Sequence, residues 1–277
     1  MKKYAWRIYI CIIFAVLYIP IVTLILFSFN ASSSTAEFTG FSFRWYRALF
    51  DEETRDATFT ALRNTLILAV LSSVISTVIG TAAAEGIYKM KSKLVRKVVT
   101  SVTNIPMMNP EIVTGMSMML LFVAVAATFR TEYETIGFGA MLIAHVTFCL
   151  PYVILSVLPR INELGDSLSE AALDLGCTPL QAFFKVKLPN IMPGVISGMV
   201  MAFTLSLDDF VISYFVGSSN FQTLPLLIYS MTKKKVTPDM YALSTLIVVA
   251  VFILLLVSNM NTKRDKVASG KRAGGKK

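Results

Sequence analysis

The fold of this chain is decided by a polar stretch, residues 170–189, which reads EAALDLGCTPLQAFFKVKLP. It lies between two apolar segments that are each long enough to cross a bilayer. The stretch begins with strong helix formers, and Gly176 stands where a left-handed C-terminal cap would end that helix. Thr178 and Pro179 form an N-cap and first-turn pair for a second helix, which Pro189 is predicted to end. The pattern predicts two short helices with a bend between them.

The composition is that of a membrane protein. Of the 277 residues, 55% are hydrophobic and 16% are charged, whereas soluble domains carry about 25% charged residues. The net charge of +9 comes from basic residues that flank apolar segments, so membrane orientation explains it better than nucleic-acid binding. The three cysteines show no pairing pattern. We therefore predict an all-α polytopic protein, with one transmembrane domain over residues 1–260 and a basic, disordered tail over residues 261–277.

Six apolar segments reach the length of about 20 residues that a membrane-spanning helix needs. They cover residues 8–29, 64–84, 98–127, 136–158, 191–216 and 242–260. The first follows a short basic N-terminus but is too long for a signal peptide and lacks a cleavage site, so we interpret it as an uncleaved span. Residues 30–63 are predicted to form a polar loop, and the apolar residues 221–231 to lie back against the membrane.

The distribution of basic residues sets the orientation, because cytoplasmic segments are enriched in Lys and Arg. With six spans and the N-terminus inside, 18 of the 26 Lys and Arg residues lie in cytoplasmic segments. The exception is the run of three lysines at 233–235, which this topology places outside. The sequence therefore predicts that both termini, and the loop over residues 159–190, are cytoplasmic.

The polar loop contains an acid, several small residues and a terminal Leu-Pro pair at fixed spacing. These residues are Glu170, Ala171, Ala172, Gly176, Val186, Leu188 and Pro189. In this spacing it resembles the EAA loop of ABC-importer permease subunits, although the family usually has Ile at position 186. The resemblance implies the six-helix fold of type I ABC importer permeases. It also implies that the loop helix docks in a cleft of the ATP-hydrolysing subunit. The alternative for the stretch by itself is an ordinary amphipathic loop helix.

The sequence contains no arrangement typical of a catalytic or metal site. It has no G-x-x-x-x-G-K-[ST] phosphate loop, no nucleophile elbow and no His/Cys cluster. We therefore expect no catalytic residue, metal or cofactor in this chain, and the resemblance implies that ATP and Mg²⁺ are bound by the partner ATPase. The single histidine, His145, is predicted to be a hydrogen-bonded packing residue within a span.

Four acids lie within or beside the predicted spans, where ionisable residues usually face a pathway or a partner. Glu85 borders a basic loop and can pair with Lys89, four residues on. Glu111 follows a proline break. Asp208 and Asp209 are predicted to lie about 100° apart on one helix, so that one can face a pore while the other pairs with a neighbouring helix. No Lys or Arg lies deep in the predicted spans, so this lining suits a cationic solute.

Aromatic residues accompany these acids, as in sites that hold an alkylammonium by charge and cation–π contact. The predicted substrate pathway consists of Asp208, Asp209, Glu111, Tyr214, Phe210 and Tyr152. The alternative is that any single one of the aromatic residues only packs.

Four segments carry a closer resemblance. They are PMMNPEIV (106–113), HVTFCLP (145–151), SLDDFVIS (206–213) and LPLLIYSM (224–231). Together they resemble the polyamine-importer permeases, over about residues 8 to 260, and most closely the second permease of the spermidine/putrescine system. The family usually has Asp at position 111. The resemblance implies a heterodimer with a second permease, an ATPase pair and an extracytoplasmic polyamine-binding protein, in the lipid of a bacterial inner membrane and without nucleic acid.

Other functions remain as alternatives. An ABC permease for iron, phosphate or sulfate is the nearest, although anions call for basic residues or helix N-termini in the lining. A channel or secondary transporter needs no ATPase-docking helix, and the chain has no evident inverted repeat. A membrane enzyme would need a catalytic constellation. The choice between spermidine and putrescine stays open.

Overall fold

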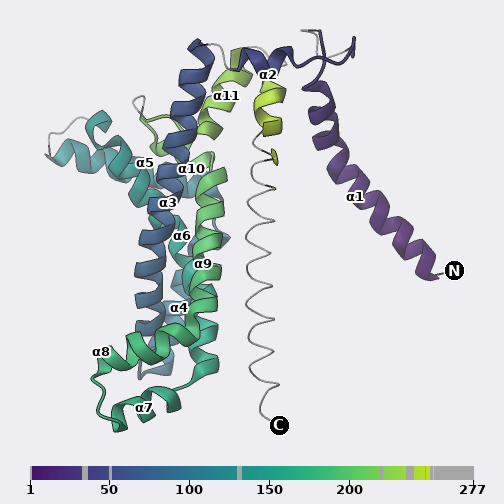
Figure 1. Ribbon diagram of the computed structural model, residues 1–277. Coiled ribbons are helices and arrows are strands. Elements are labelled where there is room, and N and C mark those ends of the chain that lie inside the picture. Colours follow the sequence, from purple (N-terminus) through teal and green to yellow (C-terminus); the bar gives the residue numbers. More distant parts are fainter. Residues whose placement is uncertain are drawn as a thin grey trace. The chain divides into compact units, whose positions relative to one another are not determined.

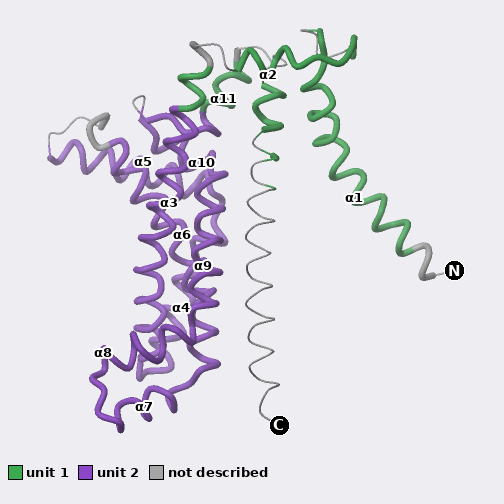
Figure 2. The backbone as a smooth tube through the Cα atoms, viewed as in Figure 1, with its two compact units in different colours: residues 1–59, 227–277 green, residues 60–226 purple. Residues whose placement is uncertain are grey.

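The computed structural model describes residues 2–32, 37–49, 52–129, 133–218, 221–234, 240–246, 248–249 and 252 (Figure 1). In these ranges every regular element is a helix, and the one β-type contact is an isolated bridge between Asn30 and Phe41. The all-α prediction is therefore confirmed. The chain divides into two compact units, residues 1–59 with 227–277 and residues 60–226 (Figure 2).

The helices follow one another along the chain with short connections. They are α1 (Lys2–Phe27), α2 (Arg44–Ala48), α3 (Glu52–Tyr88), α4 (Lys93–Met108), α5 (Glu111–Phe129), α6 (Tyr133–Leu164), α7 (Ser167–Asp174), α8 (Pro179–Ala182), the π-helix η1 (Phe183–Lys187), α9 (Leu188–Asp208), α10 (Val211–Val216) and α11 (Leu224–Lys234).

Five stretches of helix in the described part of the chain are long and apolar enough to cross a membrane. They are Trp6–Phe27, Arg55–Tyr88, Glu111–Phe129, Gly137–Leu164 and Pro179–Asp208. The sixth predicted span, residues 242–260, lies mostly outside the described residues. Most predicted spans are therefore confirmed, with shifted ends.

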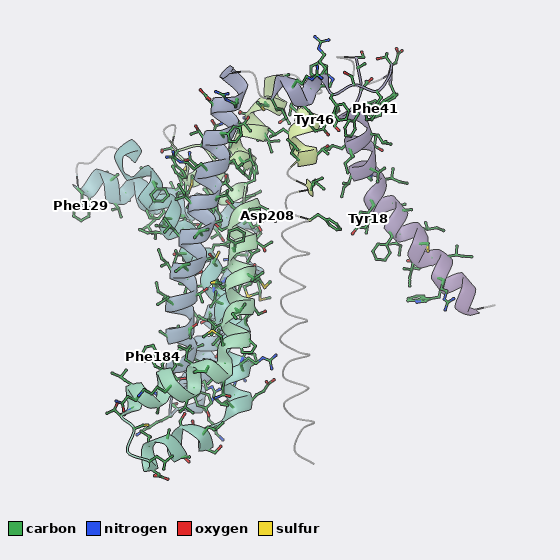
Figure 3. The ribbon with its side chains drawn as sticks, in the orientation of Figure 1. Tyr18, Phe41, Tyr46, Phe129, Phe184 and Asp208 are labelled. Carbon is green, nitrogen blue, oxygen red and sulfur yellow. The ribbon has the colours of Figure 1, made fainter. Side chains whose placement is uncertain are left out.

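The first unit corrects the prediction of a polar loop over residues 30–63, since α2 and the start of α3 are helical. Aromatic packing orders this segment. The Phe29 ring stacks on Phe41 with centroids 4.8 Å apart and lies 5.0 Å from the Tyr46 ring (Figure 3). Trp45 Nε1 donates a hydrogen bond to the Asn30 carbonyl oxygen at 2.6 Å. Aromatic rings bury large apolar areas, so this cluster supplies the packing that a solvated loop lacks.

The second unit is built around the contact between α6 and α9. Its tightest point involves the spacing Gly194-x-x-x-Gly198, which lets two helix backbones approach closely. A Cβ atom on Gly194 would lie 2.8 Å from the Ser156 carbonyl oxygen, and one on Gly198 would lie 3.2 Å from the Val153 Cα. A side chain at Gly194 would collide with the α6 backbone, and one at Gly198 would require that backbone to shift by a few tenths of an ångström. Helices α6 and α9 therefore form the rigid centre of this unit.

The segment before α11 packs against protein, which corrects the expectation that residues 221–231 as a whole lie against the membrane. The Leu224 amide donates to Thr65 Oγ1 at 2.8 Å, and Asn64 Nδ2 donates to the Gln222 carbonyl at 3.1 Å. The Phe221 ring lies 4.9 Å from that of Phe138 on α6. Since α3 carries both polar partners, the start of α11 is fixed to α3 by directional bonds.

Within the second unit, the elements that matter for function lie at opposite ends of the α3, α6 and α9 bundle. Helices α7 and α8 lie at one end, and α5 and α10 lie toward the other (Figure 1). A single helix connects these ends, because α8, η1 and α9 continue into one another from Pro179 to Asp208.

Candidate functional site

The loop over residues 159–190 folds as two helical arms joined by a left-handed turn, as predicted. Gly176 has a φ of +86°, a conformation that L side chains rarely adopt. The Cys177 amide donates to the Ala172 carbonyl at 3.0 Å, and the Gly176 amide donates to the Leu173 carbonyl at 2.9 Å. These two bonds form a Schellman motif, which satisfies the last carbonyls of α7. The bend is thus fixed by backbone geometry.

The second arm begins with the predicted cap, in a fuller form. Thr178 Oγ1 accepts a hydrogen bond from the Gln181 amide, and the Gln181 side chain accepts one from the Thr178 amide. This reciprocal pair is a capping box, with Pro179 in the first turn. Both arms are therefore held by local bonds as well as by packing.

The prediction that Pro189 ends the second helix is wrong. The chain widens into η1, where the Leu188 amide bonds to the Phe183 carbonyl five residues back, and then continues as α9. Pro189 falls in the first turn of α9, where a missing N–H costs little. The Asn190 side chain donates to the Val186 carbonyl at 2.7 Å. The wide turn thus accommodates the proline without a break.

The predicted coupling residues lie together on this loop. Glu170, in the first turn of α7, and Ala171 are exposed, whereas Ala172 is buried; Leu188 is half-buried and Pro189 is exposed. Large apolar side chains also face outward around the bend, with 87% of Leu175 exposed, and with Leu180, Phe184, Leu173 and Leu168 exposed as well (Figure 3). An exposed apolar surface of this kind is typical of a protein contact site.

Asp208 and Asp209 do not share one helix, which corrects the prediction of a 100° separation. Asp208 is the last residue of α9, and Asp209 adopts an extended conformation with a ψ of 123°. Helix α10 then starts anew at Val211. At this interruption Asp208, labelled in Figure 3, is exposed, whereas Asp209 is buried.

The Asp209 carboxylate forms the N-terminal cap of α10. Oδ2 accepts from the Ser213 amide at 2.8 Å, and Oδ1 accepts from the Ile212 amide at 3.2 Å. His145 Nε2 on α6 lies 3.5 Å from Oδ2. Asp209 thus has a ring nitrogen from a neighbouring helix beside it as well as the two amides. The helix dipole and two amide donors stabilise this buried charge as well.

His145 links four helices through hydroxyl groups, as expected of a hydrogen-bonded packing residue. Its Nδ1 lies 2.8 Å from Ser206 Oγ on α9, and its Nε2 lies 3.2 Å from Ser213 Oγ on α10. Ser72 Oγ on α3 donates to Ser206 Oγ at 2.8 Å. Because the Asp209 carboxylate can only accept, the tautomer with its proton on Nε2 fits these partners best. The network joins α3, α6, α9 and α10 at the interruption.

Glu111 stands at a second helix interruption, at the proline break that the sequence predicts, and the apolar span begins there instead of at residue 98. Helix α4 ends at Met108, Asn109 is extended with a ψ of 141°, and α5 begins at Glu111 after Pro110. A proline disfavours helical geometry in the residue before it, which explains the division. The Glu111 side chain is exposed in the first turn of α5, where the helix dipole favours a negative charge.

The three predicted aromatic residues lie in two places. The Phe210 and Tyr214 rings, beside Asp208 at the start of α10, have centroids 5.6 Å apart, and Tyr214 is exposed. Tyr152 on α6 is half-buried and packs edge-on against Phe148 at 5.7 Å. The structure therefore groups Phe210 and Tyr214 with Asp208, whereas Tyr152 lies on a different helix against Phe148.

A buried ion pair beneath the loop was not predicted. Lys187, the last residue of η1, places its Nζ 2.8 Å from Glu85 Oε2 on α3. The predicted pair between Glu85 and Lys89 is confirmed at 3.1 Å. The periodicity of α9 indicated that Lys187 would be buried, since it precedes buried Ile191 by four residues and buried Gly194 by seven.

Within the described part of the chain, no group of three or more His, Cys, Asp or Glu residues is placed to hold a metal ion.

These features define the membrane-spanning component of a transporter, with apolar helices, an exposed helical loop at one end and charged residues at helix interruptions. The sequence profile of the family described as "Binding-protein-dependent transport system inner membrane component" matches residues 76–261. The chain belongs to this family.

The chain is also similar to individual relatives. It is 39% identical over 250 residues to the "Putrescine transport system permease protein PotI" of Escherichia coli (strain K12), which covers 90% of this chain and 88% of the relative. It is 35% identical over 254 residues to the "Spermidine/putrescine transport system permease protein PotC" of Haemophilus influenzae, covering 92% and 95%. The fold matches a chain in the crystal structure of a bacterial ABC transporter for the acidic polysaccharide alginate, with a TM-score of 0.73, 18% identity and 95% of each chain covered.

Proposed function

We propose that this chain is a permease subunit of an ATP-driven importer that carries polyamines, spermidine or putrescine, into the bacterial cytoplasm. The names of the relatives at 35–39% identity support this substrate class. The observation that carries the proposal is the exposed Asp208 carboxylate at the interruption between α9 and α10. A carboxylate at this depth that faced lipid would be costly, so it faces a pathway or a partner subunit.

The substrate contacts follow from the two interruptions. Asp208 supplies negative charge beside the Phe210 and Tyr214 rings. Glu111 supplies a second carboxylate at the other interruption, in the first turn of α5. A polyamine carries several ammonium groups along an apolar chain, so separated acids with aromatic neighbours match its charge pattern. Asp209 takes no part in this lining, because its carboxylate is buried as the cap of α10.

The loop with Glu170 and Gly176 transmits the conformational change of the ATP-hydrolysing subunit to the membrane helices. Its exposed apolar side chains, Leu175, Leu180 and Phe184, dock in a cleft of an ATP-hydrolysing subunit. ATP and Mg²⁺ bind to that subunit dimer. A second permease completes the pathway, and an extracytoplasmic binding protein delivers the polyamine. No step requires a catalytic residue or cofactor in this chain.

The excess of Lys and Arg in the segments assigned to the inside supports a cytoplasmic location for this loop and both termini, where ATP is available. A reporter fused after Lys277 tests this orientation. Activity of the reporter only on the outer side of the membrane contradicts it.

Uptake of radiolabelled spermidine and putrescine tests the substrate assignment. We expect Asp208→Asn and Glu111→Gln to lower uptake about ten- to a hundredfold, since each removes one charge-assisted contact worth about 1.5–3 kcal/mol. Both residues are exposed, so both variants should assemble with the ATPase at parental levels. Two variants that assemble and transport like the parent overturn the assignment of the pathway.

A further inference from the structure

The Lys187–Glu85 ion pair lies where the exposed loop meets the membrane helices. Only 3% of the Lys187 side chain and 12% of the Glu85 side chain are exposed. The ammonium donates to Glu85 Oε1 at 3.0 Å and lies 2.8 Å from Oε2, so it contacts both oxygens of the carboxylate. It also lies 4.4 Å from the centroid of the Tyr88 ring. Lys187 thus joins η1 to the end of α3 through a charge pair and an aromatic face.

Stability alone does not account for this pair. Removing two charges from water costs several kcal/mol per ion, and well-packed apolar residues often replace a buried pair with no loss of stability. Glu85 does not depend on Lys187 for neutralisation, because Lys89, four residues on in the chain, already pairs with it. Lys187 has the more unusual position, since Lys185 in the same π-helix is exposed.

The position of the pair suggests its role. The second arm of the loop, η1 and α9 form one continuous stretch from Pro179 to Asp208. Its longest part, α9, has 21 residues and is therefore roughly 32 Å long at 1.5 Å per residue. The Schellman turn and the capping box fix the loop at one end, and Asp208 lies at the other. The ion pair attaches this stretch to α3 close to the loop.

We propose that the Lys187–Glu85 pair is the joint that transmits movement of the coupling loop to α3 and α9 together. This inference rests on the coupling role proposed above for the loop. Apolar contacts are non-directional and let two helices slide past one another. The charge-assisted hydrogen bond from the Lys187 ammonium to Glu85 is directional and is lost if the two helices move apart. Lys187 and Glu85 are therefore positioning residues, and movement of the loop reaches the interruption at Asp208 because they hold α9 in register with α3.

Three variants separate this role from a merely structural one. Lys187→Met removes the joint and leaves Glu85 paired with Lys89. Glu85→Gln combined with Lys187→Met removes the joint and leaves no buried charge unpaired. Lys89→Met removes only the exposed pair with the same carboxylate and serves as the matched control. Each is reconstituted as the full complex, and polyamine uptake, ATP hydrolysis and ATPase association are measured side by side.

We expect Lys187→Met and the double variant to associate with the ATPase and to hydrolyse ATP at the basal rate, without stimulation by the binding protein. Their uptake should fall about tenfold, the scale on which coupling networks respond to mutation. Lys89→Met should stay within about twofold of the parent in all three measurements, as surface substitutions do. Parental uptake by Lys187→Met or by the double variant overturns the inference. If the double variant fails to assemble, Lys187→Met alone decides.

The same experiment distinguishes failure of the proposed substrate. A parent complex that imports neither spermidine nor putrescine contradicts the proposed function. The role of the Lys187–Glu85 pair is then tested by measuring how far the binding protein stimulates ATP hydrolysis. This stimulation should be lost in Lys187→Met and kept in Lys89→Met. Equal stimulation in the two variants overturns the inference on its own.

Discussion

Two helices of this chain are interrupted, and the interruptions have different causes. Between α4 and α5 the cause is covalent, because Pro110 lacks an amide hydrogen and forces Asn109 into an extended conformation. Between α9 and α10 there is neither proline nor glycine. There Asp209 is extended because its carboxylate accepts bonds from the Ile212 and Ser213 amides and lies next to His145.

The difference shows which interruption depends on the rest of the fold. The bend before Pro110 follows from local chemistry and would be present in an isolated peptide. The bend at Asp209 needs a histidine from α6, so it exists only while α6 and α10 are packed together. A movement of α9 relative to α6 can therefore alter the bend beside Asp208 and leave the proline bend intact.

The largest effect is expected from Asp209→Ala. This change leaves two amides and the His145 ring without their acceptor in a buried place. Each buried donor left unsatisfied costs about 1–3 kcal/mol, and these three lose their acceptor together. We expect a lower unfolding temperature of the complex in detergent and little assembled protein in the membrane. Thermal unfolding and membrane protein level are the measurements.

The neighbouring residue provides the control. Asp208→Ala removes an exposed carboxylate one position away, so the unfolding temperature should match that of the parent while uptake falls. If both alanine variants unfold alike, the carboxylate of Asp209 does not maintain the interruption.

A smaller loss is expected from His145→Phe. Ser206 and Ser213 lose a ring nitrogen, but Asp209 keeps both amide donors. The cost of such unpaired buried groups is about 1–3 kcal/mol. Thermal unfolding should show an intermediate decrease, and His145→Gln, which retains a donor and an acceptor, should recover part of it. A decrease as large as that of Asp209→Ala would mean that the histidine, not the amide cap, holds the bend.

The sequence was sufficient for the features that local chemistry decides. Five apolar segments, the left-handed turn at Gly176 and the cap at Thr178 followed from residue type and spacing. The end of the second helix did not, because a π-helix moved Pro189 into the first turn of α9. From sequence alone, a proline in the first turn of a helix cannot be told from a proline that ends one, because the difference depends on the structure of the preceding turn.

For the candidate site, the sequence predicted which residues take part better than it predicted how they are arranged. Asp208 and Asp209 were both found as acids within a span, but period-3.6 reasoning placed them on one helix. The interruption arises from contacts with His145, which lies far from it in the sequence. The contact between His145 and Ser206, for example, joins residues that are 61 positions apart, and no local pattern encodes such contacts. Lys187 was missed for a related reason, since its partner Glu85 lies 102 residues away.

The smallest effect is expected from Pro110→Ala. This change frees the backbone of Asn109, yet no buried carboxylate or amide loses a partner in the described structure around Glu111. The unfolded chain gains conformational freedom, which costs about 0.4–1 kcal/mol. We expect a small decrease in unfolding temperature and a parental protein level. Uptake reports separately on whether Glu111 has moved, because a helix that continued through position 110 would rotate its side chain.

The comparison of the two interruptions depends on this result. If packing rather than the proline divides α4 from α5, Pro110→Ala will leave uptake unchanged, and the bend will have two independent causes. If the proline is the cause, uptake will fall while stability is nearly kept, the reverse of the pattern for His145→Phe. A destabilisation as large as that of Asp209→Ala is the one outcome that contradicts the distinction, because it would require a buried bonding network at Asn109 like the one at Asp209.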